Sequence, residues 1–167
     1  MRILDANKQD LAAGTQGTVY VRSPPEGGFV YFKSDEKTAN SYHDNYFTMG
    51  DHGFFDADGY LFLTGRDAEL IISGGVNIYP QEIDDVLMQL PVVHDSCTIG
   101  VPDEEWGEAV KAIVELVPGT IADDALAAEL LAHCSVSIAG FKCPRSIEFQ
   151  ADLPRLPSGK IQRHKVR

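Results

Sequence analysis

The sequence has little basic charge. It holds 14 Lys and Arg residues against 25 Asp and Glu residues, which gives a formal net charge of −11. This balance argues against nucleic acid or an acidic membrane surface as a general partner, because both are polyanions. The sequence also lacks a run of eighteen apolar residues and an opening signal-peptide pattern. We therefore expect no integral membrane segment and a cytoplasmic location.

Cysteine is scarce too. The three cysteines, Cys97, Cys134 and Cys143, are an odd number and share no Cys-x-x-Cys spacing. Cys97 and Cys134 fall in apolar patterns, so we expect both to be buried free thiols, as in a reducing compartment. No metal site is predicted within the chain.

The basic charge that is present gathers at the carboxyl end. Residues 153–167 contain no acid and hold Arg155, Lys160, Arg163, Lys165 and Arg167. We call residues 153–163 the arm. Pro154 and Pro157 deny it regular hydrogen bonding, and Ser158-Gly159 predicts a mobile turn just before Lys160. This pattern indicates a charge that is delivered to an anion, outside any core. The alternatives are a solvated basic tail and an end that docks on its own acidic body. A P-loop is excluded, because Pro154 and Ile161 stand where that motif requires Gly and Ser or Thr.

Residues 1–65 are predicted to form mostly short strands. Strands are expected within 1–12 and at 18–21 and 29–32, with a short helix over 34–42. A hairpin is expected from 52–55 and 60–64, with Asp56–Gly59 as its turn. Gly65-Arg66-Asp67 then interrupts the pattern.

Residues 68–150 read as β-α-β-β-α-β. Strands are expected at 70–72, 92–101, 110–117 and 145–149, with helices that begin at Pro80 and after a capping box at 120–123. The predicted apolar faces are Ile83, Val86, Leu87 and Leu90; Val93, Cys97, Ile99 and Val101; and Leu126, Leu130 and Cys134. The fold class is therefore α+β: a strand-rich part, then a short hairpin and a three-stranded sheet with helices on one face.

Three segments then occur in order. They are Tyr46-Phe47-Thr48-Met49-Gly50-Asp51; residues 65–83, which include Ile71-Ile72-Ser73-Gly74-Gly75-Val76-Asn77-Ile78-Tyr79-Pro80; and Leu156-Pro157-Ser158-Gly159-Lys160-Ile161. From about Gly14 to its end, the chain resembles the carboxyl-terminal part of adenylate-forming ligases, most like the fatty-acyl-CoA synthetases.

The resemblance implies a reaction and a domain plan. Such enzymes join a carboxylic acid to AMP using ATP, release pyrophosphate, and then let CoA displace AMP. Residues 1–65 would end the large amino-terminal domain, 66–69 would be the hinge, and 70–167 would be the small mobile domain. That domain turns between the two half-reactions.

The resemblance also assigns roles to four residues. Lys160 would be the catalytic residue, an ammonium that offsets charge at the α-phosphoryl group. Asp51 and Arg66 would bind the nucleotide, the first at the ribose hydroxyls and the second at phosphate or ribose oxygens. Asp67 would be the hinge residue. Without the resemblance, Asp51 is a turn-capping residue, Arg66 pairs with Asp67 or Glu69, and Asp67 is a loop acid.

A second group would face CoA. Ser73, Gly74 and Gly75 lack bulk, so their backbone can pass close to pantetheine; the alternative is a plain hairpin turn. Lys142 would meet a CoA phosphate or stay solvated. Trp106 resembles a packing residue near the CoA-facing side, and we expect it to pack in the core.

The family's upstream motifs are absent from the sequence. It has no phosphate loop and no Tyr-Gly-x-Thr-Glu segment, whose Glu would hold Mg²⁺. We therefore expect a fragment that is inactive without the missing amino-terminal domain, and its acyl substrate cannot be read. A carrier-protein-loading adenylation domain and a non-catalytic interaction module remain as alternatives.

Overall fold

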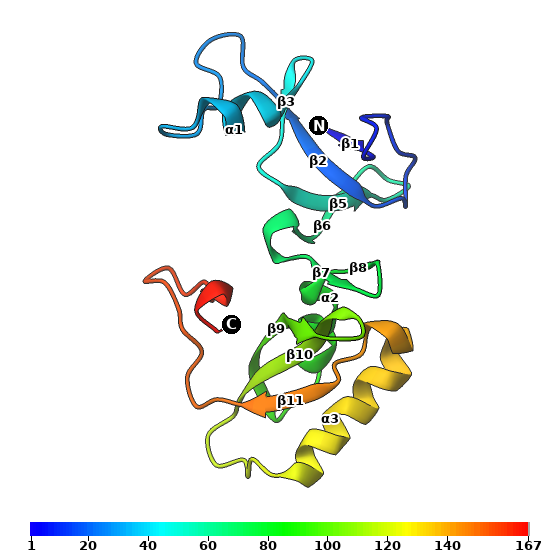
Figure 1. Cartoon of the computed structure of the whole chain (residues 1–167), viewed down its shortest axis with the longest axis vertical. Helices are drawn as coiled ribbons and strands as arrows, with labels where there is room; N and C mark the ends of the chain where they lie inside the picture. The colour runs from blue at the N-terminus through cyan, green and yellow to red at the C-terminus, as the bar shows by residue number, and fades with distance from the viewer. Residues whose placement is uncertain (167) are drawn as a thin grey trace. The chain divides into compact units, whose positions relative to one another are not determined.

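The computed structural model describes residues 1–166. The chain divides into two compact units, Met1–Ala68 and Glu69–Arg167 (Figure 1). The division falls inside the segment 66–69, in which Asp67–Glu69 form a 3-10 turn. Whether this segment acts as a hinge stays a prediction, and each unit is described by itself below.

The first unit is built on a six-stranded antiparallel sheet. Its order is β3-β4-β2-β5-β6, and β1 also pairs with β2. The strands are β1 (Arg2–Leu4), β2 (Gly17–Arg22), β3 (Tyr42–His43), β4 (Tyr46–Phe47), β5 (Asp51–Phe55) and β6 (Leu61–Arg66). The prediction of mostly short strands is confirmed.

β5 and β6 form a hairpin close to the carboxyl end of this unit. The Asp56 carboxylate accepts hydrogen bonds from the backbone N–H groups of Asp58 and Tyr60. Gly59 takes the left-handed conformation, with φ of +85°, which a side chain would disfavour. The turn was predicted from these residue types. It lets β5 and β6 pair, so that Phe55 lies opposite Leu61 beside the turn and Asp51 lies opposite Arg66 at the far end of the hairpin.

Residues 29–32 form no strand, contrary to the prediction. The ring of Phe29 stacks on that of Phe47 at 5.0 Å instead. The Tyr31 backbone N–H donates to the hydroxyl of Thr38 in α1 (Asp35–Asn40). Phe32 is 87% exposed. The alternating aromatic residues thus pack on a neighbouring strand and helix, and no partner strand completes their backbone hydrogen bonds.

The second unit confirms the α+β prediction. Its sheet has the order β11-β10-β7-β8, and β9 pairs with β10. Its elements are β7 (Ile71–Ser73), β8 (Val76–Ile78), α2 (Pro80–Leu87), β9 (Val93–Asp103), β10 (Gly107–Leu116), α3 (Asp124–Ser137) and β11 (Ser146–Phe149). β7 and β8 are the predicted short hairpin, and β10 pairs with β11 in parallel.

The two faces of this sheet are covered differently. On one face, the apolar stripes of α2 and α3 pack on Val110, Ala112 and Val114 of β10 (Figure 1). On the other, Cys97, Ile99 and Ile113 pack against Leu153, with Ile161 and Val166 beside them. Leu153 is only 3% exposed. The arm therefore belongs partly to a core, which corrects the prediction: it covers apolar side chains that the helices leave open.

Two local predictions were also wrong. Val93 packs with the helices and does not share a face with Cys97, because the register of β9 and β10 shifts next to Leu116. A bulge of this kind reverses the alternation of side chains. Asp123 is itself the N-cap of α3, and its carboxylate accepts from the Leu126 N–H at 2.8 Å. Thr120 is therefore not the cap of a capping box.

Candidate functional site

Asp51 and Arg66, both predicted to bind nucleotide, are brought together in the first unit. They are direct partners across the β5–β6 ladder. Arg66 Nε donates to Asp51 Oδ1 at 2.6 Å. Arg66 thus pairs with Asp51, and the alternative pairing with Asp67 or Glu69 is wrong. The pair places a carboxylate and a fork of donors side by side at the end of the hairpin.

Asp67, the predicted hinge residue, lies next to the same strand ends. Its backbone N–H donates to the Gly50 carbonyl at 2.9 Å, and its Oδ1 atom lies 2.5 Å from His52 Nε2, within hydrogen-bond distance. A pocket of about 460 Å³ opens beside it. The side chains and backbone that line this pocket come from Tyr31, Lys37, Asn40, Ser41, Thr48, Met49, Gly50, Arg66, Asp67 and Ala68. Sequence reasoning missed Tyr31 and Lys37, because only the fold brings α1 beside the motif at 46–51.

Lys160 projects from a tight turn in the arm. The Leu156 N–H donates to the Lys160 carbonyl, and the Gly159 N–H donates to the Leu156 carbonyl, both at 2.8 Å. A bridge between Arg155 and Ile161 closes the turn. Lys160 itself is exposed. The predicted mobile turn is thus a closed loop that presents an ammonium group to solvent.

The Ser73-Gly74-Gly75 turn joins β7 to β8. Gly74 has a φ of +57°, and a Cβ atom there would lie 2.6 Å from Trp106 Cε3. The Gly74 N–H donates to the Trp106 carbonyl at 2.8 Å. Glycine is therefore required at 74 for both its conformation and its contact with the indole.

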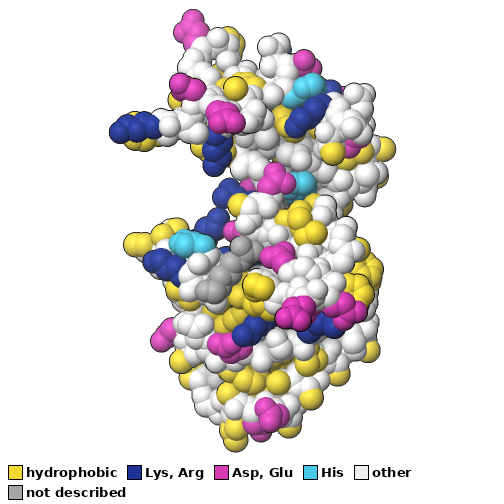
Figure 2. All heavy atoms as spheres, in the orientation of Figure 1, with side chains coloured by type: hydrophobic (Ala, Val, Ile, Leu, Met, Phe, Trp, Pro, Cys, Tyr) yellow, Lys and Arg dark blue, Asp and Glu magenta, His cyan; other side chains and the backbone are white. Residues whose placement is uncertain are grey.

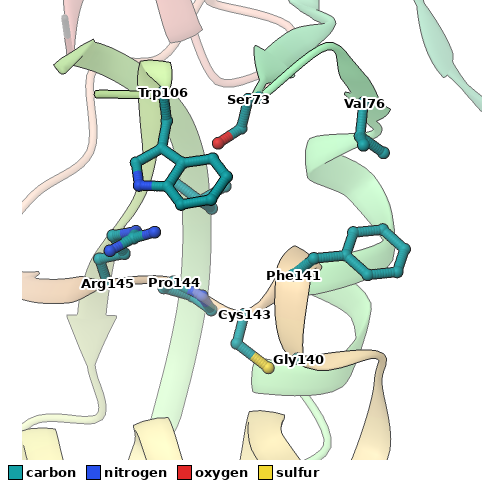
Figure 3. A pocket seen from close by; sticks show the side chains of 10 residues that line it. Ser73, Val76, Trp106, Gly140, Phe141, Cys143, Pro144 and Arg145 are labelled. Atoms are coloured by element: carbon teal, nitrogen blue, oxygen red, sulfur yellow. The ribbon is translucent and has the colours of Figure 1, made fainter. Parts of the chain in front are cut away.

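A pocket of about 330 Å³ lies beside this turn. It is lined by Ser73, Gly74, Val76, Trp106, Val110, Gly140, Phe141, Cys143, Pro144 and Arg145. Figure 3 shows Trp106 and Arg145 on one side of it, with Val76 and Phe141 on the other. The opening is thus walled by apolar groups and one guanidinium.

Trp106 is part of this pocket wall. It is 39% exposed, so the prediction that it packs in the core is wrong. The guanidinium of Arg145 lies 5.3 Å from the centre of its ring, a cation–π distance. Sequence reasoning missed Arg145 and Phe141, although the run of aromatic and basic residues from Phe141 to Arg145 was a usable signal.

Lys142 is half-buried and does not belong to the pocket lining. Its ammonium donates to both carboxylate oxygens of Glu82 in α2, at 2.8 and 2.7 Å. This pair ties the 3-10 turn Gly140–Lys142 to the first turn of the helix. The cation that borders the pocket is therefore Arg145.

Comparison with known proteins matches residues 82–160 to the model of the AMP-binding enzyme C-terminal domain. A sulfoacetate–CoA ligase of Cupriavidus necator is 42% identical over 137 residues, which are 81% of this chain and 26% of that enzyme. A feruloyl-CoA synthase of an Amycolatopsis species is 38% identical over 167 residues, 100% of this chain and 33% of the enzyme. The structure of ATP-bound MatB from Rhodopseudomonas palustris has a TM-score of 0.89 at 34% identity, over 99% of this chain and 33% of that one. The chain belongs to the adenylate-forming ligases, as their carboxyl-terminal part.

The likeness extends over both units of this chain. An anthranilate CoA ligase in complex with anthranoyl-AMP has a TM-score of 0.87 at 34% identity and is matched over 99% of the present chain. The chain spans about a third of the length of such relatives. The acids in their names differ widely, so the comparisons support the C-terminal part of acyl-CoA ligases in general and do not single out those of fatty acids.

Within residues 1–166, the chain holds no group of three His, Cys, Asp or Glu residues placed to bind a metal ion. None of the helices in that range is long and apolar enough to cross a membrane. On the face drawn in Figure 2, the described Lys and Arg side chains are scattered among acidic ones and form no continuous basic surface.

Proposed function

We propose that these residues form the end of the large domain, the hinge and the mobile small domain of an ATP-dependent acyl-CoA synthetase. The reaction joins a fatty or related carboxylic acid to CoA through an acyl-adenylate, with AMP and pyrophosphate as products. The observation that carries the proposal is the pocket at Gly74, Trp106 and Arg145, because the arm that bears Lys160 contributes nothing to its lining. The second unit thus carries the Lys160 turn, which we assign to adenylation, and a separate pocket, which we assign to thioester formation.

For the first half-reaction, we assign ATP to Asp51, Arg66 and Lys160. A carboxylate is repelled by the triphosphate that it must attack. The exposed ammonium of Lys160 offsets this repulsion and the charge that grows on the α-phosphoryl oxygens. Asp51 accepts hydrogen bonds from ribose hydroxyls, and Arg66, which is already held by Asp51, donates to ribose or phosphate oxygens.

For the second half-reaction, we assign CoA to the pocket. The side-chain-free backbone at Gly74 and Gly75 leaves room for the thin pantetheine chain. Trp106 and Phe141 offer aromatic surfaces, and Arg145 supplies donors for a phosphate. Lys142 is the weaker candidate for that phosphate, because Glu82 already neutralises it.

The isolated residues 1–167 are expected to be inactive. The relatives are about three times as long, and the phosphate loop and the segment whose Glu would hold Mg²⁺ are not in this sequence. The partner of these residues is therefore the family's large amino-terminal domain, and the small-molecule substrates are ATP, a carboxylic acid and CoA. The cytoplasmic location stays a prediction.

The test separates the two half-reactions in the full-length ligase. Acid-dependent pyrophosphate exchange reports adenylation, and CoA consumption from supplied acyl-adenylate reports thioester formation. Gly74→Ala places a methyl group 2.6 Å from the Trp106 ring and should impair only thioester formation. Gly119→Ala is the matched control, because Gly119 also has a positive φ (+91°), nothing lies within 4 Å of the added methyl group, and the residue does not line the pocket.

Three results would contradict the proposal. If the wild-type enzyme shows neither half-reaction, the chain is a non-catalytic module. Transfer of the acyl group to a carrier protein, with CoA ignored, would favour the adenylation-domain alternative. Equal loss of both half-reactions in Gly74→Ala would mean that the pocket serves the fold and not CoA.

A further inference from the structure

Arg163 stands three residues after Lys160 and is held by three different parts of the second unit. Its Nη2 atom lies 3.0 Å from Asp84 Oδ2, and its Nε atom lies 3.3 Å from Glu69 Oε2. Its Nη1 atom donates to the carbonyl of Thr98. The side chain is only 13% exposed. This degree of burial is far from that of a solvated basic tail.

Asp84 anchors this contact from inside α2. It is 2% exposed and accepts hydrogen bonds from the Ser96 hydroxyl at 3.0 Å and the Thr98 N–H at 2.7 Å. Burial raises the pKa of Asp84, and the charge of Arg163 and the hydrogen bonds from Thr98 act against that shift. A buried charge is costly without its partner, so each member of the pair holds the other in place.

The pair sits on an edge strand. Among residues 1–166, β9 pairs only with β10. The Asp84 carboxylate accepts a hydrogen bond from the backbone N–H of Thr98, and the Arg163 guanidinium donates one to the backbone C=O of the same residue. The two side chains thus satisfy the groups that a further strand would otherwise pair with. The arm is fixed to β9 at this point.

A second attachment lies on the other side of the Lys160 turn. Arg155 Nη1 is 2.6 Å from Asp95 Oδ2, and its Nη2 is 3.1 Å from Glu115 Oε2. The turn that bears Lys160 is therefore anchored before and after the lysine, by Arg155 and by Arg163. Neither arginine lies in the pocket assigned to CoA.

We propose that Arg163, held by Asp84, is a positioning residue for Lys160. This inference rests on the proposed function. Arg163 fixes the base of the Lys160 turn to the edge of the sheet and to Glu69, the first residue of the second unit. The ammonium then keeps one place on that unit and is carried with it when the unit turns. Arg163 acts through Lys160 and touches no substrate.

The experiment uses the full-length ligase with Arg163→Gln and Arg163→Lys. A misplacement of about 1 Å costs on the order of a hundredfold in rate, so we expect a loss of that size in pyrophosphate exchange for Arg163→Gln. Arg163→Lys keeps the charge beside Asp84 but not the fork of donors, and should lose about tenfold. Both variants should form thioester from supplied acyl-adenylate at the wild-type rate, which also shows that they fold.

The Lys160→Ala background separates positioning from general destabilisation. If Arg163 acts only through Lys160, adding Arg163→Gln to Lys160→Ala causes no further loss of pyrophosphate exchange. Amide hydrogen exchange at Leu156 and Gly159 should speed up in Arg163→Gln. The matched control is Glu148→Gln, which breaks an ion pair with Lys111 (Nζ to Oε2, 2.6 Å) between two strands of the same unit and should leave both half-reactions unchanged.

The outcomes distinguish this inference from the proposed function. A wild-type enzyme without either half-reaction, or a Lys160→Ala variant with normal adenylation, overturns the proposed function. If those two behave as expected, normal adenylation in Arg163→Gln overturns the positioning role alone. Equal loss of both half-reactions, or a further loss in the double variant, overturns it too, because Arg163 would then support the fold as a whole.

Discussion

The Lys160 side chain is exposed, and hydrogen bonds hold the backbone of its turn. A substitution there should therefore remove the charge and leave the turn in place. In the full-length ligase, Lys160→Ala should abolish nearly all acyl-adenylate formation, leaving a small residual rate, and spare thioester formation from supplied acyl-adenylate. The ammonium meets a developing anion only in the first step. Such a donor is worth roughly 3–4 kcal/mol, or about a hundred- to a thousand-fold in rate. Pyrophosphate exchange and CoA consumption measure the two steps.

Lys165 provides the control for that change. It is an exposed lysine near the same end of the chain, so Lys165→Ala removes an equal charge and should leave adenylation unchanged. Lys160→Arg should rescue poorly, because a planar fork does not replace a compact ammonium. Acetylation of Lys160 should mimic alanine. Equal loss in both assays for Lys160→Ala would mean that the lysine is structural.

The cysteines are free and differ in burial. Cys97 and Cys134 are buried, as predicted, and burial raises the pKa of each thiol to about 11. At pH 8 only about one part in a thousand is then thiolate. We expect iodoacetamide to modify the half-buried Cys143 first and the other two only after unfolding, as mass spectrometry would show. Equal rates in the folded protein would contradict this.

The same shift has a consequence for stability. Because the pKa values of Cys97 and Cys134 are raised in the folded state, the folded protein binds these protons more tightly than the unfolded one. Their contribution to the free energy of unfolding is therefore constant below the ordinary cysteine pKa. It decreases as the pH rises from about 8.5 toward 11.

At the scale of elements, the segment between β6 and β7 is the predicted hinge. Asp67→Pro in the full-length ligase should impair one half-reaction more than the other. Proline fixes φ, and it removes the N–H that donates to Gly50. Asp67→Ala, which leaves φ free, is the control. The two half-reaction assays measure the effect, and limited proteolysis should cut near this segment. Strong hydrogen-exchange protection over residues 64–69 would count against a hinge.

Local patterns predicted most elements correctly. The Asp56–Gly59 turn and the apolar stripe of α2 are encoded by residues close in sequence, so the hairpin and the helix followed from them. Residues 29–32 alternate like a strand but have no strand beside them, and the face of Val93 depends on a bulge. Both outcomes are decided by partners distant in the sequence, which a local pattern does not contain.

The candidate site shows the same difference between what local motifs predict and what only the fold determines. Motifs predicted that Asp51, Arg66 and Lys160 carry the chemistry, and the roles stay proposals. Sequence patterns did not predict the Asp51–Arg66 pair, the Lys142–Glu82 pair or the partial exposure of Trp106 in a pocket wall. Each arises between elements whose neighbours only the fold determines.

For the whole molecule, residues 1–167 alone should bind ATP weakly or not at all. Asp51, Arg66 and Lys160 provide few contacts, and few contacts rarely overcome the cost of association. Titration calorimetry of the isolated residues with ATP is the measurement, and the full-length ligase is the control. Micromolar affinity for residues 1–167 would contradict the expectation.

The arm covers a sheet face that no helix covers, and this ties the enzyme's solubility to its chemistry. Loss of residues 153–167, by proteolysis or an early stop codon, would remove more than Lys160. It would bare Cys97, Ile99 and Ile113 and leave the β9 edge at Thr98 without Arg163. An apolar face beside an open strand edge favours self-association. A chain that ends before residue 153 should therefore aggregate more readily than one that carries Lys160→Ala alone.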